Sequence, residues 1–212
     1  MYFRILNDES SGELTYLLAD LEAGEAVLID PHGRDLAVLQ ALLAERELRL
    51  RWVLRTHHHD ALQTAEPLLL KRLGAPLVQG DALLQTTGLA GDGFLSFGDE
   101  LMQVLRTPGH TPHCLSYGWR DRLFCGGLLG VTACPHQPVP AEPQALWDSV
   151  TQKLFTLPDE TLLFSSHEQR ARAVSTVLEQ RRWHPLFAGL TRDEFLAHMA
   201  ALPEQQPLAP TL

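Results

Sequence analysis

The stretch LRWVLRTHHHD, residues 50–60, joins a short apolar run to three consecutive histidines. The run LRWVL has the length and apolar content of a β-strand, and the histidines follow where that strand leaves its sheet. Side chains at such a strand end can converge on a cleft, which favours a functional site over a solvated polar turn. In extended backbone, residues two apart point the same way, so His57 and His59 can share a metal ion while His58 faces elsewhere.

Two further segments place a histidine directly after a strand-like run. In RTPGHTPH, residues 106–113, proline and glycine fix the backbone of the turn that carries His110. In SSHE, residues 165–168, His167 follows the strand-like run TLLF. Three such clusters predict a shared histidine site, in which one imidazole can instead be a structural hydrogen-bonding group.

Strand-like and helix-like runs are distributed along the whole chain. Expected strands cover residues 1–6, 14–20, 25–30, 50–56, 75–80, 94–98, 101–108, 114–119, 122–126 and 161–166. Expected helices cover residues 35–47, 62–73, 143–155 and 169–182. The strands fall into two groups separated by helices, so we expect an α/β sandwich of two packed sheets with helices outside. The Pro-rich residues 202–212 predict an irregular surface segment.

Composition bounds the kind of partner that the chain can bind. With 212 residues, 45% of them hydrophobic, we expect one domain spanning residues 1–212. The formal charge of −9 disfavours nucleic-acid and anionic-membrane partners, which bind clustered Lys and Arg. A small-molecule partner fits better, and a homo-oligomer stays open. The sequence shows no Gly-rich phosphate loop, no secretory signal and no membrane-length apolar run, and its three cysteines form no paired framework, so we expect a cytoplasmic protein.

Four segments resemble the ordered motifs of the metallo-β-lactamase superfamily, particularly its persulfide dioxygenases and glyoxalase II enzymes. They are THHHDALQTA (56–65), TPGHTPHCLSY (107–117), RLFCGGLL (122–129) and PDETLLFSSHEQRARAVSTV (158–177). The resemblance runs from Ile29 to the segment AGLTRDEFLAHM (188–199), so it covers nearly the whole chain. It implies an αββα sandwich of two mixed sheets packed face to face, and it tilts toward the persulfide dioxygenase branch.

The same resemblance implies one metal site and the loss of a second. His57, His59 and His110 match the first-metal ligands of the family, a three-imidazole set that can hold one Fe(II) or Zn(II) ion per chain with open positions. Ala61 and Leu62 stand where the first motif of the family has Asp and His. The second metal position is therefore not expected to hold an ion.

Two more family positions bear on catalysis. Gly127 stands where the family has a metal-ligating Asp, while His167 matches the last histidine of the family and is a candidate contact for substrate or water. Asp60 lies one residue before the missing Asp and is a second candidate catalytic residue, the alternative being a loop-capping carboxylate.

The segment Cys134-Pro135-His136 stands where the family has Cys-Gly-Arg. The family's Arg is expected to help hold a glutathione carboxylate, and an imidazole is not equivalent to a guanidinium fork, so glutathione is a weaker candidate substrate. Cys134, like Cys114 and Cys125, is expected to be an ordinary buried residue.

Three functions follow from these expectations. The first is a mononuclear metal enzyme of the persulfide dioxygenase type, with a small thiol or persulfide substrate. The second is a zinc-dependent thioester or ester hydrolase of the glyoxalase II type, in which the metal activates water. The third is a catalytically impaired binding or sensing module that keeps the fold.

Overall fold

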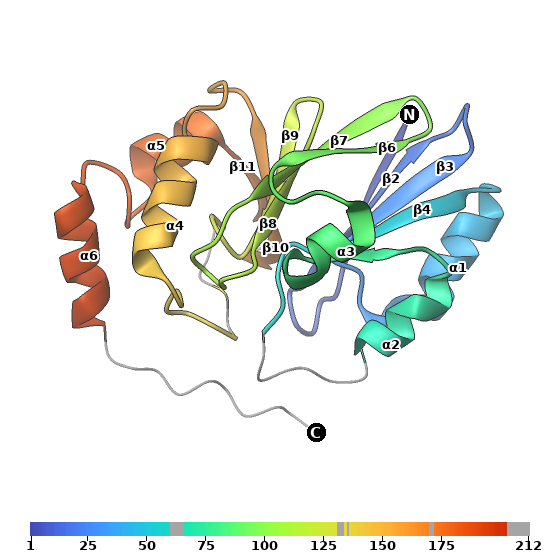
Figure 1. Cartoon of the computed structure of the whole chain (residues 1–212), viewed down its shortest axis with the longest axis horizontal. Coiled ribbons are helices and arrows are strands. Elements are labelled where there is room, and N and C mark those ends of the chain that lie inside the picture. Colours follow the sequence, from blue (N-terminus) through green and yellow to red (C-terminus); the bar gives the residue numbers. More distant parts are fainter. Residues whose placement is uncertain (60–65, 131–133, 135, 170–171, 203–212) are drawn as a thin grey trace.

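The computed structural model describes residues 1–59, 66–130, 134, 136–169 and 172–202. Two β-sheets form the centre of the molecule, and helices cover their outer faces (Figure 1). The first sheet contains five strands in the spatial order β1-β2-β3-β4-β5. They are β1 (Tyr2–Asn7), β2 (Leu14–Asp20), β3 (Glu25–Ile29), β4 (Arg49–Leu54) and β5 (Leu77–Val78).

The second sheet contains six strands in the order β11-β10-β9-β8-β7-β6. They are β6 (Gly93–Phe97), β7 (Glu100–Arg106), β8 (Leu115–Trp119), β9 (Arg122–Gly126), β10 (Leu162–Gln169) and β11 (Arg172–Thr176). Both sheets are mixed, because β3, β4 and β5 run parallel in the first and β9 and β10 run parallel in the second, while the other pairs are antiparallel.

The helices lie on the two outer faces, except for one that places Leu83 in the core between the sheets (Figure 1). They are α1 (Leu36–Glu45), α2 (Glu66–Leu70), α3 (Leu83–Thr87), α4 (Pro143–Ser149), α5 (Val177–Trp183) and α6 (Arg192–Ala201). Short 3₁₀ turns at Gly33–Asp35, Lys71–Leu73 and Gly80–Ala82 and a π-turn at Val150–Leu154 adjoin them. No helix in the described part of the chain is long and apolar enough to cross a membrane.

Strand β2 shows how alternating side chains of one strand enter different layers of the sandwich. Alternate side chains of a strand point to opposite faces, and every residue of β2 is buried. Tyr16 and Leu18 pack into the core between the sheets, whereas Leu17 and Ala19 pack under α1 on the outer face. A third apolar cluster joins β9 and β10 to α4, α5 and α6. These three clusters confirm the expected αββα sandwich.

The predicted helix at residues 169–182 is wrong over its first part. Strand β10 extends to Gln169, and β11 pairs with it antiparallel through Ser175 and Leu163. The helix begins only at Val177, after Thr176 caps it by accepting a hydrogen bond from the Glu179 amide. The charge distribution of this segment favoured one long helix, but pairing with β10 supplies tertiary hydrogen bonds that local pattern does not show.

The other expected elements are present where the structure describes the chain, although the strand expected at 75–80 is reduced to Leu77–Val78, and the sequence patterns did not predict α3 and α6. The helix expected at 62–73 is present from Glu66 and ends at Gly74, whose φ of 78° terminates it in the left-handed region; its first four residues lie outside the described residues. The helix expected at 143–155 is present as α4 and the π-turn that follows. Of the segment 202–212, only residue 202 is described.

Candidate metal centre

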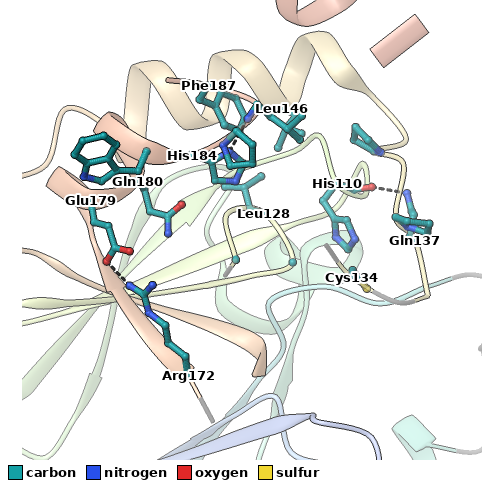
Figure 2. A pocket seen from close by; sticks show the side chains of 17 residues that line it. His110, Leu128, Cys134, Gln137, Leu146, Arg172, Glu179, Gln180, His184 and Phe187 are labelled. Atoms are coloured by element: carbon teal, nitrogen blue, oxygen red, sulfur yellow. Dashed lines mark hydrogen bonds and ion pairs between the residues drawn. The ribbon is translucent and has the colours of Figure 1, made fainter. Parts of the chain in front are cut away.

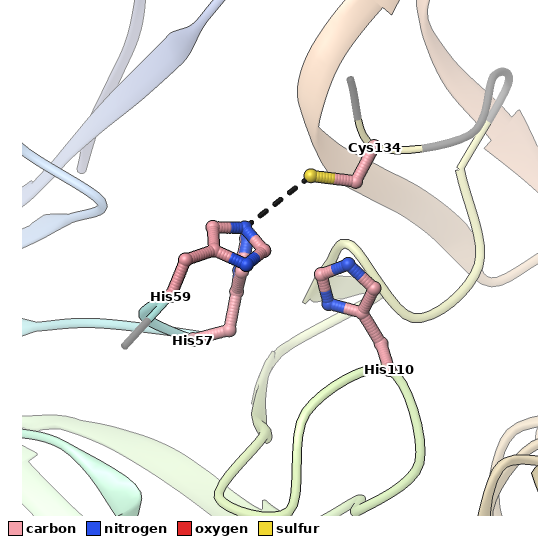
Figure 3. Close-up of side chains that lie close together, drawn as sticks. All are labelled: His57, His59, His110 and Cys134. Carbon is pink, nitrogen blue, oxygen red and sulfur yellow. Dashed lines mark hydrogen bonds between the residues drawn. The ribbon is translucent and has the colours of Figure 1, made fainter. Parts of the chain in front are cut away.

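Three imidazoles converge at the edge of the sandwich (Figure 3). His57 and His59 follow β4, and His110 lies in the loop between β7 and β8. Their ring centroids are 4.8 Å apart for His57 and His110, 5.0 Å for His57 and His59, and 5.3 Å for His59 and His110. The structure therefore brings together the three histidines that the sequence selected as metal ligands.

A buried carboxylate fixes the orientation of His57. Asp30 accepts hydrogen bonds from the backbone amide of Thr56 (2.7 Å), the Thr56 hydroxyl (2.8 Å) and the Ser166 hydroxyl (2.8 Å). Because the Thr56 hydroxyl has one proton and donates it to Asp30, its oxygen accepts from Nδ1 of His57 at 2.8 Å. This network assigns the tautomer of His57 and leaves the Nε2 lone pair free for a metal.

An amide side chain holds the other two imidazole loops together. Gln137 donates from Nε2 to the carbonyl of His110, so its Oε1 accepts from Nδ1 of His59 at 3.1 Å. Nδ1 of His110 lies 3.8 Å from Sγ of Cys114. Nε2 of His110 is buried and has no hydrogen-bond partner within the described residues. A buried nitrogen without a partner is costly unless something else binds it, and a metal ion would.

Cys134 is the residue that sequence reasoning missed. Its buried Sγ lies 3.4 Å from Nε2 of His59 (Figure 3), and one ligand atom each from His57, His59, His110 and Cys134 lies within 4.8 Å of the others. The signal in the sequence was weak, since this cysteine belongs to no CxxC pair.

Glycine at position 127 is explained by the same cluster. A Cβ atom there would lie 2.5 Å from Cε1 and 2.6 Å from Nδ1 of His110. The His110 ring thus occupies the space that a carboxylate side chain at this position would need. The site departs from the family pattern at Gly127 in a way that the surrounding packing accommodates.

Burial keeps the imidazoles neutral, which is the form that binds metals. Desolvation lowers the pKa of His57 well below its usual value and lowers the pKa of His110 to about 3. The pKa of His59 is lowered for the same reason. Burial also raises the pKa of the Cys134 thiol. These residues fit a cation, which three free imidazole lone pairs would bind and whose charge would favour the thiolate.

His167 lies beside this group rather than within it. Its Nε2 is 3.6 Å from Sγ of Cys134, and its Nδ1 is buried without a hydrogen-bond partner in the part of the chain that the structure describes. Burial lowers the pKa of His167 to about 4. His58 instead stacks on His113, with ring centroids 6.0 Å apart. Asp60, the other candidate catalytic residue, lies outside the described residues.

A cavity of about 450 Å³ adjoins the imidazoles (Figure 2). His110 and Cys134 form part of one wall, and apolar side chains that include Leu146 and Phe187 form much of the rest. At the far end Arg172 forms an ion pair with Glu179. The cavity can therefore bring a small, largely apolar molecule up to the imidazole group.

The chain is similar to known proteins over most of its length. No protein-family model matches the chain. The mitochondrial persulfide dioxygenase ETHE1 of Bos taurus is 32% identical over 213 residues, covering 96% of this chain and 82% of that protein. A hydroxyacylglutathione hydrolase of Yersinia enterocolitica is 33% identical over 72% of this chain and 61% of its own length. The crystal structure of ETHE1 from Myxococcus xanthus superposes with a TM-score of 0.86 at 36% identity, covering 98% of this chain and 93% of that one.

Proposed function

Because this chain belongs to the persulfide dioxygenase family of the metallo-β-lactamase superfamily, we propose that it oxidises a small persulfide with O₂. One iron(II) ion would be held by His57, His59 and His110. The observation that carries this proposal is the convergence of three neutral imidazoles whose Nδ1 atoms all face protein partners. Such a set leaves coordination positions for other ligands.

The overall reaction balances without a further reductant. A persulfide RSSH, O₂ and water give the thiol RSH and sulfurous acid: the S–S bond breaks, the outer sulfur is oxidised, the inner sulfur takes up one of the electrons to become the thiol, and O₂ accepts the other four. Iron(II), when bound, supplies the O₂ chemistry. The protein contributes orientation, through the Thr56 and Gln137 hydrogen bonds to the imidazoles, and a cavity beside His110 for the substrate. His167 and Asp60 are the proposed contacts to substrate or water.

Charged groups beside the imidazoles and in the cavity wall bear on which persulfide fits. His136 replaces the family's arginine, and its Nε2 lies 3.7 Å from a Glu13 carboxylate oxygen. Within the described lining, the cation Arg172 already pairs with Glu179. A glutathione persulfide, with two carboxylates, would meet an acidic group at one position and a neutralised cation at the other. These observations favour a persulfide with fewer charges.

Iron-loaded protein tests the proposal directly. We expect O₂ uptake and sulfite formation with a small organic persulfide, and loss of both in His110→Ala with the fold intact by circular dichroism. His198→Ala, on the exposed side of α6, is the matched control and should keep full activity. Iron-loaded protein that consumes no O₂ with organic, glutathione or inorganic persulfides would overturn the proposal.

A second candidate is a zinc-dependent thioester hydrolase. It is supported by the similarity to hydroxyacylglutathione hydrolase and by a three-imidazole set, on which zinc lowers the pKa of bound water toward about 7. Thioester cleavage by zinc-loaded protein that disappears in His110→Ala would favour this function. The third candidate, a binding or sensing module without catalysis, predicts well under one equivalent of metal in untagged protein and no turnover in either assay.

A further inference from the structure

Cys134 stands where a fourth metal ligand would stand. Its Sγ is 3.4 Å from Nε2 of His59, and one ligand atom each of His57, His59, His110 and Cys134 falls within 4.8 Å of the others. Ligand atoms about 2.0–2.3 Å from a tetrahedral zinc ion lie roughly 3.3–3.6 Å apart, so the sulfur–nitrogen separation is already that of a coordinated pair.

An independent observation points to a ligand at this cluster. His110 is 4% exposed, and its Nε2 has no hydrogen-bond partner among the described residues, although its other ring nitrogen contacts Cys114. Burial of an imidazole nitrogen without a partner is unfavourable. A cation between His110 and Cys134 would satisfy this nitrogen and would also hold the thiolate.

The net charge of a divalent ion with its ligands favours one anionic ligand in this cluster. A divalent ion on three neutral imidazoles keeps its full charge in a buried site, whereas one anionic ligand lowers the net charge by one. Position 127, where the family has a carboxylate ligand, is glycine, and the His110 ring fills the space beside it. The carboxylate cannot be restored there without displacing His110. Cys134 is the described side chain of this group that can become an anion.

We propose that Cys134 is a metal ligand of this chain and supplies, as a thiolate, the negative charge that Gly127 no longer provides. The proposal uses the same metal site as the proposed function and rests on it only for the presence of a divalent ion there. Coordination requires the thiol to lose its proton to solvent, leaving a sulfur–metal bond and no change of oxidation state. A His₃Cys set would fill a tetrahedral ion, so a substrate sulfur would bind by displacing Cys134 or by expanding the coordination.

Cobalt(II) tests the proposal without any assay of turnover. The full metal-free chain is titrated with Co(II), and the wild type should show a sulfur-to-cobalt charge-transfer absorption in the near ultraviolet. Cys134→Ala and Cys134→Ser should lose this absorption, and their zinc affinity should fall by at least about 10-fold. Cys125→Ala is the control, because it removes a buried thiol that belongs to the apolar cluster between the second sheet and α4. It should keep the charge-transfer absorption and the zinc affinity of the wild type.

The outcomes separate this proposal from the proposed function. An unchanged absorption and unchanged zinc affinity in both Cys134 variants, folded by circular dichroism, would overturn the proposal even if persulfide is oxidised. A cysteine-dependent absorption in a protein that oxidises no persulfide would support Cys134 as a ligand and would overturn the proposed persulfide oxidation. A folded wild type that binds neither cobalt nor zinc would overturn both.

Discussion

The resemblance to the metallo-β-lactamase superfamily implies two metal positions, and the residues at these two positions are arranged differently in this molecule. At the first, His57, His59 and His110 each present one nitrogen to a common point while the other nitrogen faces a protein partner. At the second, His167 remains, and its Nδ1 has no partner within the described residues. His167 resembles His110 in this respect, since one ring nitrogen of each lies near a cysteine sulfur and the other is buried without a partner among the described residues. The difference is that three imidazoles converge at the first position and one stands at the second, so convergence marks a candidate ligand better than residue type alone.

Removing one of the three imidazoles at the first position should have the largest effect on metal binding and turnover. His110→Ala deletes the buried imidazole whose Nε2 lacks a partner, so we expect metal content well below one equivalent and loss of persulfide or thioester turnover. Elemental analysis of purified protein measures the metal, with His198→Ala as the control. Full metal content in His110→Ala would contradict the role of His110 as a metal ligand at the first position.

Removing the carboxylate that orients His57 should give the next largest effect. Asp30→Ala leaves buried donors on Thr56 and Ser166 without their acceptor, and we expect the free energy of unfolding of the metal-free protein to fall by about 3 kcal/mol. Urea unfolding measures it. Asp30→Asn keeps the shape and one acceptor, so it should lie between the wild type and Asp30→Ala. Wild-type stability in Asp30→Ala would show that the network does not hold the site.

A methyl group at position 127 should reduce stability and zinc binding by less than the two preceding substitutions do. Gly127→Ala places Cβ against the His110 ring, and we expect a loss of about 1–2 kcal/mol in stability together with weaker zinc binding. Gly91→Ala is the matched control, because a Cβ there meets nothing within 4 Å. Equal zinc affinity in the two variants would mean that the His110 ring moves aside at no cost.

The second position should show the smallest effect on metal. His167→Gln should keep the wild-type metal content, because His167 lies outside the group of four ligand atoms, and should alter KM or kcat for the substrate instead. Elemental analysis and steady-state kinetics on one preparation check both statements. A drop in the metal content of His167→Gln would indicate that His167 is a ligand, and would contradict the difference between His167 and the three imidazoles of the first position.

The sequence was sufficient for the fold and for the three imidazoles, because strand alternation and residues placed at strand ends are local signals. It was insufficient for Cys134, because loop geometry brings this side chain to the imidazoles and no periodicity records that contact. It also predicted a helix where β11 lies, because cross-strand pairing with β10 is not visible in a local pattern. Asp60 stays a prediction.

The hydrogen bonds that Asp30 and Gln137 accept also have a thermodynamic consequence. Since the imidazoles are already converged and their lone pairs already aimed, metal binding should order little of the chain and bury little new surface. Calorimetry should then show a small heat-capacity change on zinc binding, and the metal-free protein should unfold cooperatively, unlike small zinc domains that fold only around their ion. A scaffold that folds without its ion tolerates substitution of one ligand after another.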